Sequence, residues 1–138
     1  MSARCFLDTN ILLYAIDSRD PRKQELAEQV IQNLLVNRNG CISAQIAAEF
    51  SNNLIKKFRK TAVDAIEHCT GLRQFEVVGN TIETVELALQ LVMEQELSFW
   101  DGCVVAAALE SNCSTLFTED MQHGRKIGPL TIVNPFLS

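Results

Sequence analysis

Short apolar runs alternate with longer helical patterns along this chain, and that alternation restricts its fold more than any other feature. The apolar runs lie at 5–7, 41–43, 75–78, 115–117 and 130–133. Between them, apolar residues recur at helical spacing, as in Ile46, Phe50, Leu54 and Phe58. Short strands separated by helices of about a dozen residues are typical of βαβ units and of a parallel sheet covered on both faces. We therefore expect an α/β fold with a central parallel sheet of about five strands.

Helix boundaries follow from turn and capping residues. Asp20 and Pro21 form a strong start, because a capping side chain precedes a proline at the first helical position. That helix should run to about Val36, where the stretch 37–40 breaks it. Further helices are expected at 11–16, 46–58, 61–72, 82–92 and 99–110.

The chain has 138 residues, of which 47% are hydrophobic and 21% charged, as in an ordinary globular protein of one domain, residues 1–138. Its formal net charge is −5 and its pI is about 5.0. Proteins that hold nucleic acid by charge alone are usually basic. A nucleic-acid partner would therefore require a local basic patch or bound cations.

The five cysteines indicate a reducing compartment. Their number is odd and no two form Cys-x-x-Cys, so we expect free thiols rather than disulfides or a zinc site. No stretch is apolar enough for a signal peptide or a membrane helix. We expect a cytoplasmic protein without a membrane partner.

Four acids stand out by their positions. Asp8 follows the first apolar run and Asp120 comes three residues after the fourth, so both belong at carboxyl ends of strands, where open sheets bind ligands. Glu49 lies beside the stripe that includes Ile46, and Asp101 sits in the first turn of a very apolar helix, where the helix dipole favours an anion. Each acid alone also suits an ordinary role in a helix cap, a turn or a solvated face.

Together the four acids predict a metal site. Carboxylates at one edge of a sheet repel one another and raise one another's pKa values, unless a divalent cation binds them. A set without Cys or His favours Mg²⁺ or Mn²⁺. An ion held by a few carboxylates keeps open positions for water and for phosphate oxygens. The residues therefore favour metal-dependent chemistry on a phosphodiester.

Short motifs occur along the chain in a recognisable order. They are Leu7-Asp8-Thr9-Asn10, the segment 43–50 (SAQIAAEF), Phe99-Trp100-Asp101, the segment 116–120 (LFTED) and the segment 132–136 (IVNPF). In order and spacing the chain resembles PIN-domain proteins over essentially its whole length, specifically the VapC-type toxin ribonucleases of bacterial toxin–antitoxin pairs.

The resemblance implies a Mg²⁺- or Mn²⁺-dependent endoribonuclease, neutralised by a small antitoxin and assembled as a homodimer. By this resemblance Asp8, Glu49, Asp101 and Asp120 would be the catalytic and metal-binding acids. Thr9 or Asn10, and also Thr118, would orient the site through hydrogen bonds, and Glu119 could share ligation with Asp120. We expect hydrolysis to 3′-hydroxyl and 5′-phosphate ends.

Two basic runs are candidates for binding the RNA backbone. The first comprises Lys56, Lys57, Arg59 and Lys60, and the second comprises Arg125 and Lys126. Both also suit a solvated surface. His123 could contact the substrate, although an exposed loop histidine is the commoner role. A transfer RNA is a plausible target, but no residue selects one RNA.

Three other classes of protein could use acids placed in this way. A phosphatase of the Asp-x-Asp type needs a second acid where Asn10 stands. A receiver-like domain needs an acidic pair at the end of the first strand together with a central phospho-acceptor Asp and a late lysine, and the chain does not show this combination. A non-catalytic binding or adaptor module with the same fold remains open, and the presence of all four acids argues against it.

Overall fold

The computed structural model describes residues 3–137 as one α/β unit. The strands are β1 (Cys5–Leu7), β2 (Gly40–Ser43), β3 (Glu76–Val78), β4 (Thr115–Phe117), β5 (Lys126–Ile127) and β6 (Leu130–Val133). The helices are α1 (Thr9–Tyr14), α2 (Pro21–Asn37), α3 (Ala44–Lys56), α4 (Ala62–Gly71), α5 (Ile82–Gln95) and α6 (Phe99–Glu110), with a 3₁₀ turn, η1 (Leu72–Gln74), after α4.

The strands form one sheet in the order β3-β2-β1-β4-β6-β5. Neighbours pair in parallel except β5 and β6, which are antiparallel. The predicted α/β fold is confirmed, and the five expected strands are all present. The sixth strand, β5, was not predicted, because two residues are too few to show an alternating pattern.

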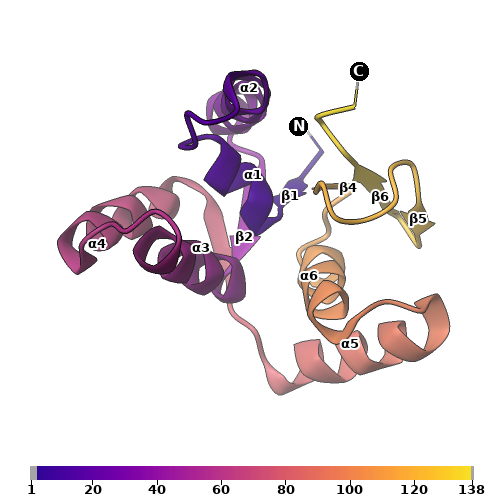
Figure 1. Ribbon diagram of the computed structural model, residues 1–138. Helices are drawn as coiled ribbons and strands as arrows, with labels where there is room; N and C mark the ends of the chain where they lie inside the picture. Colours follow the sequence, from indigo (N-terminus) through magenta and orange to yellow (C-terminus); the bar gives the residue numbers. More distant parts are fainter. Residues whose placement is uncertain (1–2, 138) are drawn as a thin grey trace.

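The direction of the chain across the sheet decides which face each helix covers. The chain moves from β1 through β2 to β3 and then crosses back to β4 on the other side of β1. Right-handed crossovers place α1 to α4 on one face and α5 and α6 on the other. Figure 1 shows these two groups apart, so the predicted covering of both faces is confirmed. The reversal between β1 and β4 is the point at which such sheets bind ligands.

The core lies between the sheet and these helices. Phe6, Ile42, Leu116 and Ile132 in the central strands are fully buried. The segment 102–108 of α6 is buried throughout, as its apolar sequence predicted. All five cysteines are free thiols. Within residues 3–137 no helix is both long and apolar enough to cross a membrane.

Helix α5 lies where it was predicted but buries a different face. Of the apolar residues that marked it, Ile82 and Leu89 are 66% and 54% exposed, whereas Thr84 and Ala88 are buried. The cause is the close packing of α5 on α6, where a Cβ on Gly102 would lie 2.9 Å from the carbonyl oxygen of Ala88. Position 102 of α6 therefore accommodates only glycine where it meets α5.

Helix α3 is shorter than its apolar stripe predicted. It ends at Lys56, and Phe58 lies beyond it in the following turn. Arg59 adopts a left-handed backbone conformation, with φ of 53°, which turns the chain away from the helix direction. The basic run therefore straddles a helix end instead of lying on one helix face.

Candidate active site

The four predicted acids line one cleft, of about 260 Å³, at the carboxyl ends of β1 and β4. Its lining residues are Asp8, Thr9, Asn10, Leu13, Glu49, Asn53, Lys57, Trp100, Asp101, Val104 and Asp120. The acids come from four separate elements: the end of β1, helix α3, the start of α6 and the loop after β4. This placement matches the edge of the sheet at which the sequence predicted them.

Asp8 is the most deeply placed acid, with 6% of its surface exposed. Its Oδ1 accepts a hydrogen bond of 2.8 Å from the Thr9 N–H, which caps α1, and its Oδ2 accepts one of 2.8 Å from the Thr118 hydroxyl. The pKa of Asp8 is raised to about 6, first by burial and also by the charges of Asp120 and Glu49, although the two hydrogen bonds act to lower it. Asp8 is thus both a helix cap and a site residue.

Glu49 points from α3 toward the start of α1. Its Oε2 accepts a hydrogen bond of 2.8 Å from the Thr9 hydroxyl, and its Oε1 accepts one of 3.0 Å from the Gln45 amide, one turn earlier on the same helix. Ser43 caps this helix through the Ile46 N–H and so fixes where α3 begins. Thr9 therefore links two acids, through its backbone to Asp8 and through its side chain to Glu49.

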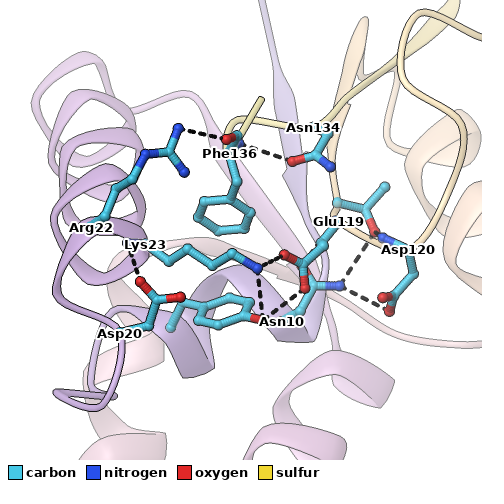
Figure 2. Close-up of polar contacts among 10 residues, drawn as sticks. Asn10, Asp20, Arg22, Lys23, Glu119, Asp120, Asn134 and Phe136 are labelled. Atoms are coloured by element: carbon cyan, nitrogen blue, oxygen red, sulfur yellow. Dashed lines mark hydrogen bonds and ion pairs between the residues drawn. The ribbon is translucent and has the colours of Figure 1, made fainter. Parts of the chain in front are cut away.

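Asn10 and Thr118 hold the loop that carries Asp120. Figure 2 shows the Asn10 amide nitrogen donating to Asp120 Oδ2, at 3.0 Å, while the Asn10 Oδ1 accepts from the Glu119 N–H at 3.2 Å. The Thr118 hydroxyl accepts from the Asp120 N–H at 3.1 Å and donates to Asp8. The orienting roles expected of Thr9, Asn10 and Thr118 therefore have specific contacts.

Asp101 enters the cleft from the first turn of α6. Its N–H donates to the hydroxyl of Ser98, the residue that caps the helix, at 3.2 Å. Asp101 is half-buried on the cleft wall beside Trp100, a residue that is 63% exposed. The motif Phe99-Trp100-Asp101 predicted a role for its acid only, and the position of Trp100 on the cleft was not predicted.

The chemistry of these donors fits a hard divalent cation. Four carboxylates share the cleft with one basic lining residue, Lys57, and the buried Asp8 is repelled by two of the others. In residues 3–137 no three carboxylate, imidazole or thiol side chains are already arranged to hold one ion together. Asp8, Glu49 and Asp120 each accept hydrogen bonds from neighbouring residues, Thr9, Gln45 and Asn10. The fit to Mg²⁺ or Mn²⁺ thus rests on donor type and on a shared cleft.

The six basic residues predicted to bind RNA lie in different places relative to the cleft. Lys57 lines the cleft, and Lys60 lines an adjoining depression. Lys56 and Arg59 are exposed on either side of Lys57 and line neither of these hollows. Arg125 donates from Nη2 to the carbonyl and side-chain oxygens of Gln95, and its neighbour Lys126 lies exposed in β5.

His123, the other candidate for substrate contact, is exposed in the loop after β4. Its Nδ1 accepts a hydrogen bond of 3.0 Å from the Asn134 N–H, so the ring holds the C-terminal segment against this loop. It does not line the carboxylate cleft. The contact found here is therefore with the protein's own backbone.

Glu119 faces away from its neighbour Asp120. It lines a separate pocket beside the cleft, where it pairs with Lys23 of α2 and accepts a hydrogen bond of 2.8 Å from the Tyr14 hydroxyl (Figure 2). The pairing with Glu119 raises the pKa of Lys23 and also that of Tyr14. Sequence reasoning found neither Lys23 nor Tyr14, because nothing in their spacing relates them to a residue about a hundred positions away.

A larger cavity, of about 460 Å³, lies away from the carboxylates, among α1 to α4 and η1. Its apolar lining residues include Leu12, Ile31, Leu35, Phe50 and Phe75. This cavity lies on the face of the sheet that α1 to α4 cover, whereas the carboxylate cleft lies at the carboxyl ends of the strands. The two hollows are lined by different sets of residues.

Comparison with solved structures shows where this fold recurs. The chain is similar to a toxin–antitoxin complex from Klebsiella pneumoniae, with 21% identity, a TM-score of 0.74 and coverage of 95% of this chain and 97% of that one. It is also similar to VapBC2 from Rickettsia felis bound to a promoter DNA fragment, with 21% identity, a TM-score of 0.69 and coverage of 93% and 96%.

A third similar structure is Mycobacterium tuberculosis VapC20, a sarcin-ricin loop cleaving toxin, with 17% identity, a TM-score of 0.62 and coverage of 81% of this chain and 86% of that one. At these identities the likeness concerns the fold. No curated protein matches the chain. Residues 5–126 match the PIN domain family, which is most of the chain. The sheet, the cleft at its reversal point and this match agree, and the chain belongs to the PIN domain family.

Proposed function

We propose that this protein is a Mg²⁺- or Mn²⁺-dependent endoribonuclease, and that it is the toxin of a type II toxin–antitoxin pair. The observation that carries the nuclease proposal is the cleft at the switch point of the sheet. Four elements each deliver one carboxylate to it, and one of these acids, Asp8, is buried. The similar solved structures include a sarcin-ricin loop cleaving toxin, which supports RNA as the substrate.

The chain's own residues divide the work as follows. Asp8, Asp101 and Asp120 would hold the ion, and Glu49 would bind it or orient the attacking water. Thr9 and Thr118 fix the orientation of Asp8 through its two hydrogen bonds. A bound Mg²⁺ or Mn²⁺ would supply positive charge to the phosphate oxygens and lower the pKa of a water. The expected products carry 3′-hydroxyl and 5′-phosphate ends.

A groove leads out of the cleft and fits a single RNA strand. The cleft shares Asn10, Leu13 and Lys57 with the neighbouring pocket, which in turn shares Arg19, Lys57 and Phe58 with an outer depression that also contains Lys60. Three basic side chains face one acid, Asp17, in that outer part. Backbone phosphates would therefore contact Lys57 and Lys60.

Trp100 offers a base-stacking surface at the other wall of the cleft. Its ring is largely exposed beside Asp101, and it packs edge-on against Phe99 at 5.1 Å between ring centres. Exposed aromatic rings in nucleic-acid channels stack bases without regard to their identity. We infer that a nucleotide next to the cleaved bond rests on this ring.

Cleavage of purified RNA tests the nuclease proposal. The wild-type chain should cut a mixture of structured RNAs, transfer RNA included, with Mg²⁺ or Mn²⁺ present, and EDTA should stop it. Asp8→Asn should lose at least about a hundredfold in rate, because it replaces a metal-binding carboxylate. Asp20→Asn is the matched control, since Asp20 caps α2 away from the cleft lining. No cleavage with either ion, or 2′,3′-cyclic phosphate ends, would refute the proposal.

The antitoxin and a second copy of the chain are the proposed protein partners. Three similar structures are complexes of VapBC or toxin–antitoxin type, which supports an antitoxin. The apolar cavity among α1 to α4 suits an amphipathic helix from such a partner. Separately, Ile82, Leu89 and Met93 expose one stripe of α5, which suits a homodimer face.

Two variants separate these interfaces. Leu35→Glu should abolish binding of a protein encoded by a neighbouring reading frame and leave RNA cleavage intact, with the exposed Gln32→Glu on the same helix as control. Leu89→Glu should shift a dimer toward monomer in light scattering. Unchanged binding in the first variant, or an unchanged mass in the second, would refute the respective interface.

A further inference from the structure

A compact cluster lies beside the cleft, between the start of α2, the end of α1 and the C-terminal segment. Lys23 pairs with Glu119 and also donates to the Tyr14 hydroxyl, at 3.3 Å. Its ammonium group lies 4.7 Å from the centre of the Tyr14 ring and 5.4 Å from that of Phe136. The side chains of Lys23 and Glu119 are only 27% and 25% exposed, so the pair is shielded more than a surface ion pair.

Several contacts hold this cluster in place. The Tyr14 and Phe136 rings meet edge to face at 5.0 Å between centres. Arg22, beside Lys23 on α2, donates to the Phe136 carbonyl oxygen at 2.8 Å, and the Asn134 side chain accepts from the Phe136 N–H (Figure 2). The Glu119 carboxylate is therefore held by side chains of α1 and α2, and the C-terminal segment is hydrogen-bonded to α2 in the same place.

The contacts that hold Glu119 also affect Asp120, through the side chain of Asn10. Asn10 accepts from the Glu119 N–H and donates to the Asp120 carboxylate, so its amide spans both residues of the loop. The Thr118 hydroxyl accepts from the Asp120 N–H on the other side. A shift of the Glu119 backbone would consequently break the hydrogen bond that orients Asp120.

We propose that Glu119 is a positioning residue, clamped by Lys23 and Tyr14, that places Asp120 at the cleft and does not itself bind the metal ion. Its carboxylate lies in the adjoining pocket, whereas that of Asp120 lies in the cleft. Both of its oxygens already have partners on the protein. This inference rests on the proposed function for the identity of the ion.

The test compares Mn²⁺ affinity in full-length variants by isothermal titration calorimetry, without RNA. Lys23→Met and Glu119→Gln should each weaken Mn²⁺ binding about tenfold, as loss of a partner that orients a ligand does. The double variant should be no weaker than either single one, because both remove the same clamp. Arg73→Met, which removes an exposed positive charge elsewhere, should bind as the wild type does.

The opposite outcome has a distinct signature. If Glu119 were a ligand, Lys23→Met would free its carboxylate and Mn²⁺ would bind as tightly as before or more tightly, which would overturn the proposal. Tyr14→Phe removes only one hydroxyl from the cluster, so it should fold and weaken binding about threefold, in line with one hydrogen bond. Unchanged affinity in this variant also counts against the clamp.

Kinetics add a second readout. The clamp acts on Asp120, so Glu119→Gln should lower kcat at limiting Mn²⁺ and recover it at saturating Mn²⁺. If the wild-type protein cleaves RNA and the Lys23→Met variant keeps full Mn²⁺ affinity, the proposed clamp is wrong and the proposed function stands. If the wild-type protein binds Mn²⁺ but cleaves no RNA, the proposed function is wrong. The calorimetric comparison of the variants then still tests the clamp.

Discussion

Asp8→Asn should make the metal-free protein more stable near neutral pH, although it should remove activity. In the folded chain the pKa of Asp8 is raised from 3.8 to about 6, first because the carboxyl group is buried. In the unfolded chain the group returns to the lower value. Since each pKa unit corresponds to about 1.4 kcal/mol, the charged carboxylate costs the folded state about 3 kcal/mol. Asparagine carries no charge and avoids this cost.

The substitution keeps the contacts that Asp8 makes. Asparagine caps helices about as well as aspartate, so the hydrogen bond from the Thr9 N–H is retained. The Thr118 hydroxyl, which donates to Asp8, can rotate and accept from the new amide. Urea unfolding in EDTA at about pH 7.5 should therefore show a gain of about 2 kcal/mol for Asp8→Asn, below the full electrostatic cost because the Thr118 contact changes.

The dependence on pH has a definite sign. Because the pKa of Asp8 is higher in the folded state, the folded chain binds the proton more tightly, and the stability this provides is lost as the pH rises from 3.8 through about 6. The advantage of Asp8→Asn over the wild type should accordingly shrink by about 1 kcal/mol between about pH 7.5 and pH 5. Comparison of the two proteins removes the other titrating groups.

Three outcomes bear on this reasoning. Asp20→Asn, the same change at the capping residue of α2, should shift stability by less than about 0.5 kcal/mol. Millimolar Mg²⁺ should stabilise the wild type and leave Asp8→Asn unchanged, because a ligand stabilises the state that binds it. If Asp8→Asn is less stable than the wild type in EDTA, or its advantage is the same at both pH values, burial does not raise the pKa of Asp8.

Two further predictions concern the RNA groove. Lys57→Ala with Lys60→Ala should weaken RNA binding about tenfold and lower the slope of log K against log salt by about 1.4, whereas Lys56→Ala with Arg59→Ala, which removes the same charge outside the groove, should do much less. Trp100→Ala should raise the KM for RNA about tenfold and Trp100→Phe should largely restore it, because loss of a stacking ring costs about 1–3 kcal/mol. Equal effects of the two double variants, or equal KM for both Trp100 variants, would contradict these roles.

Much of the site was predictable because its residues lie at strand ends. The run Cys5-Phe6-Leu7 is short and apolar, so the position of Asp8 follows from local pattern alone. The pairing of β1 with β4 then brings the loop with Asp120 beside it, and the alternation of strands and helices alone leaves that pairing open. For Glu49 the prediction also depended on which face of α3 is buried, and the stripe through Ile46 and Phe50 supplied that.

The features of the site that could not be predicted from the sequence depend on contacts between distant segments of the chain. Lys23 and Glu119 are 96 positions apart, and neither lies in a pattern that relates them. Lys56 and Lys57 are adjacent and both exposed, but only Lys57 lines the cleft, because successive residues at the end of α3 point in different directions. The two-residue strand β5 exists because β6 lies beside it, so its own sequence carries no signal for it.

The acidic character of the chain and its proposed substrate are reconciled by where the charges lie. Asp8 is unfavourable by itself, because a buried carboxylate beside two other acids costs the fold free energy. A residue that destabilises the empty protein persists in a sequence when it is needed in the bound state. The same acids that repel RNA in the metal-free chain would attract it once a cation bridges them to phosphate, with Lys57 at the cleft wall adding a fixed positive charge. RNA affinity should therefore rise with Mg²⁺ in the wild type, and this coupling should vanish in Asp8→Asn.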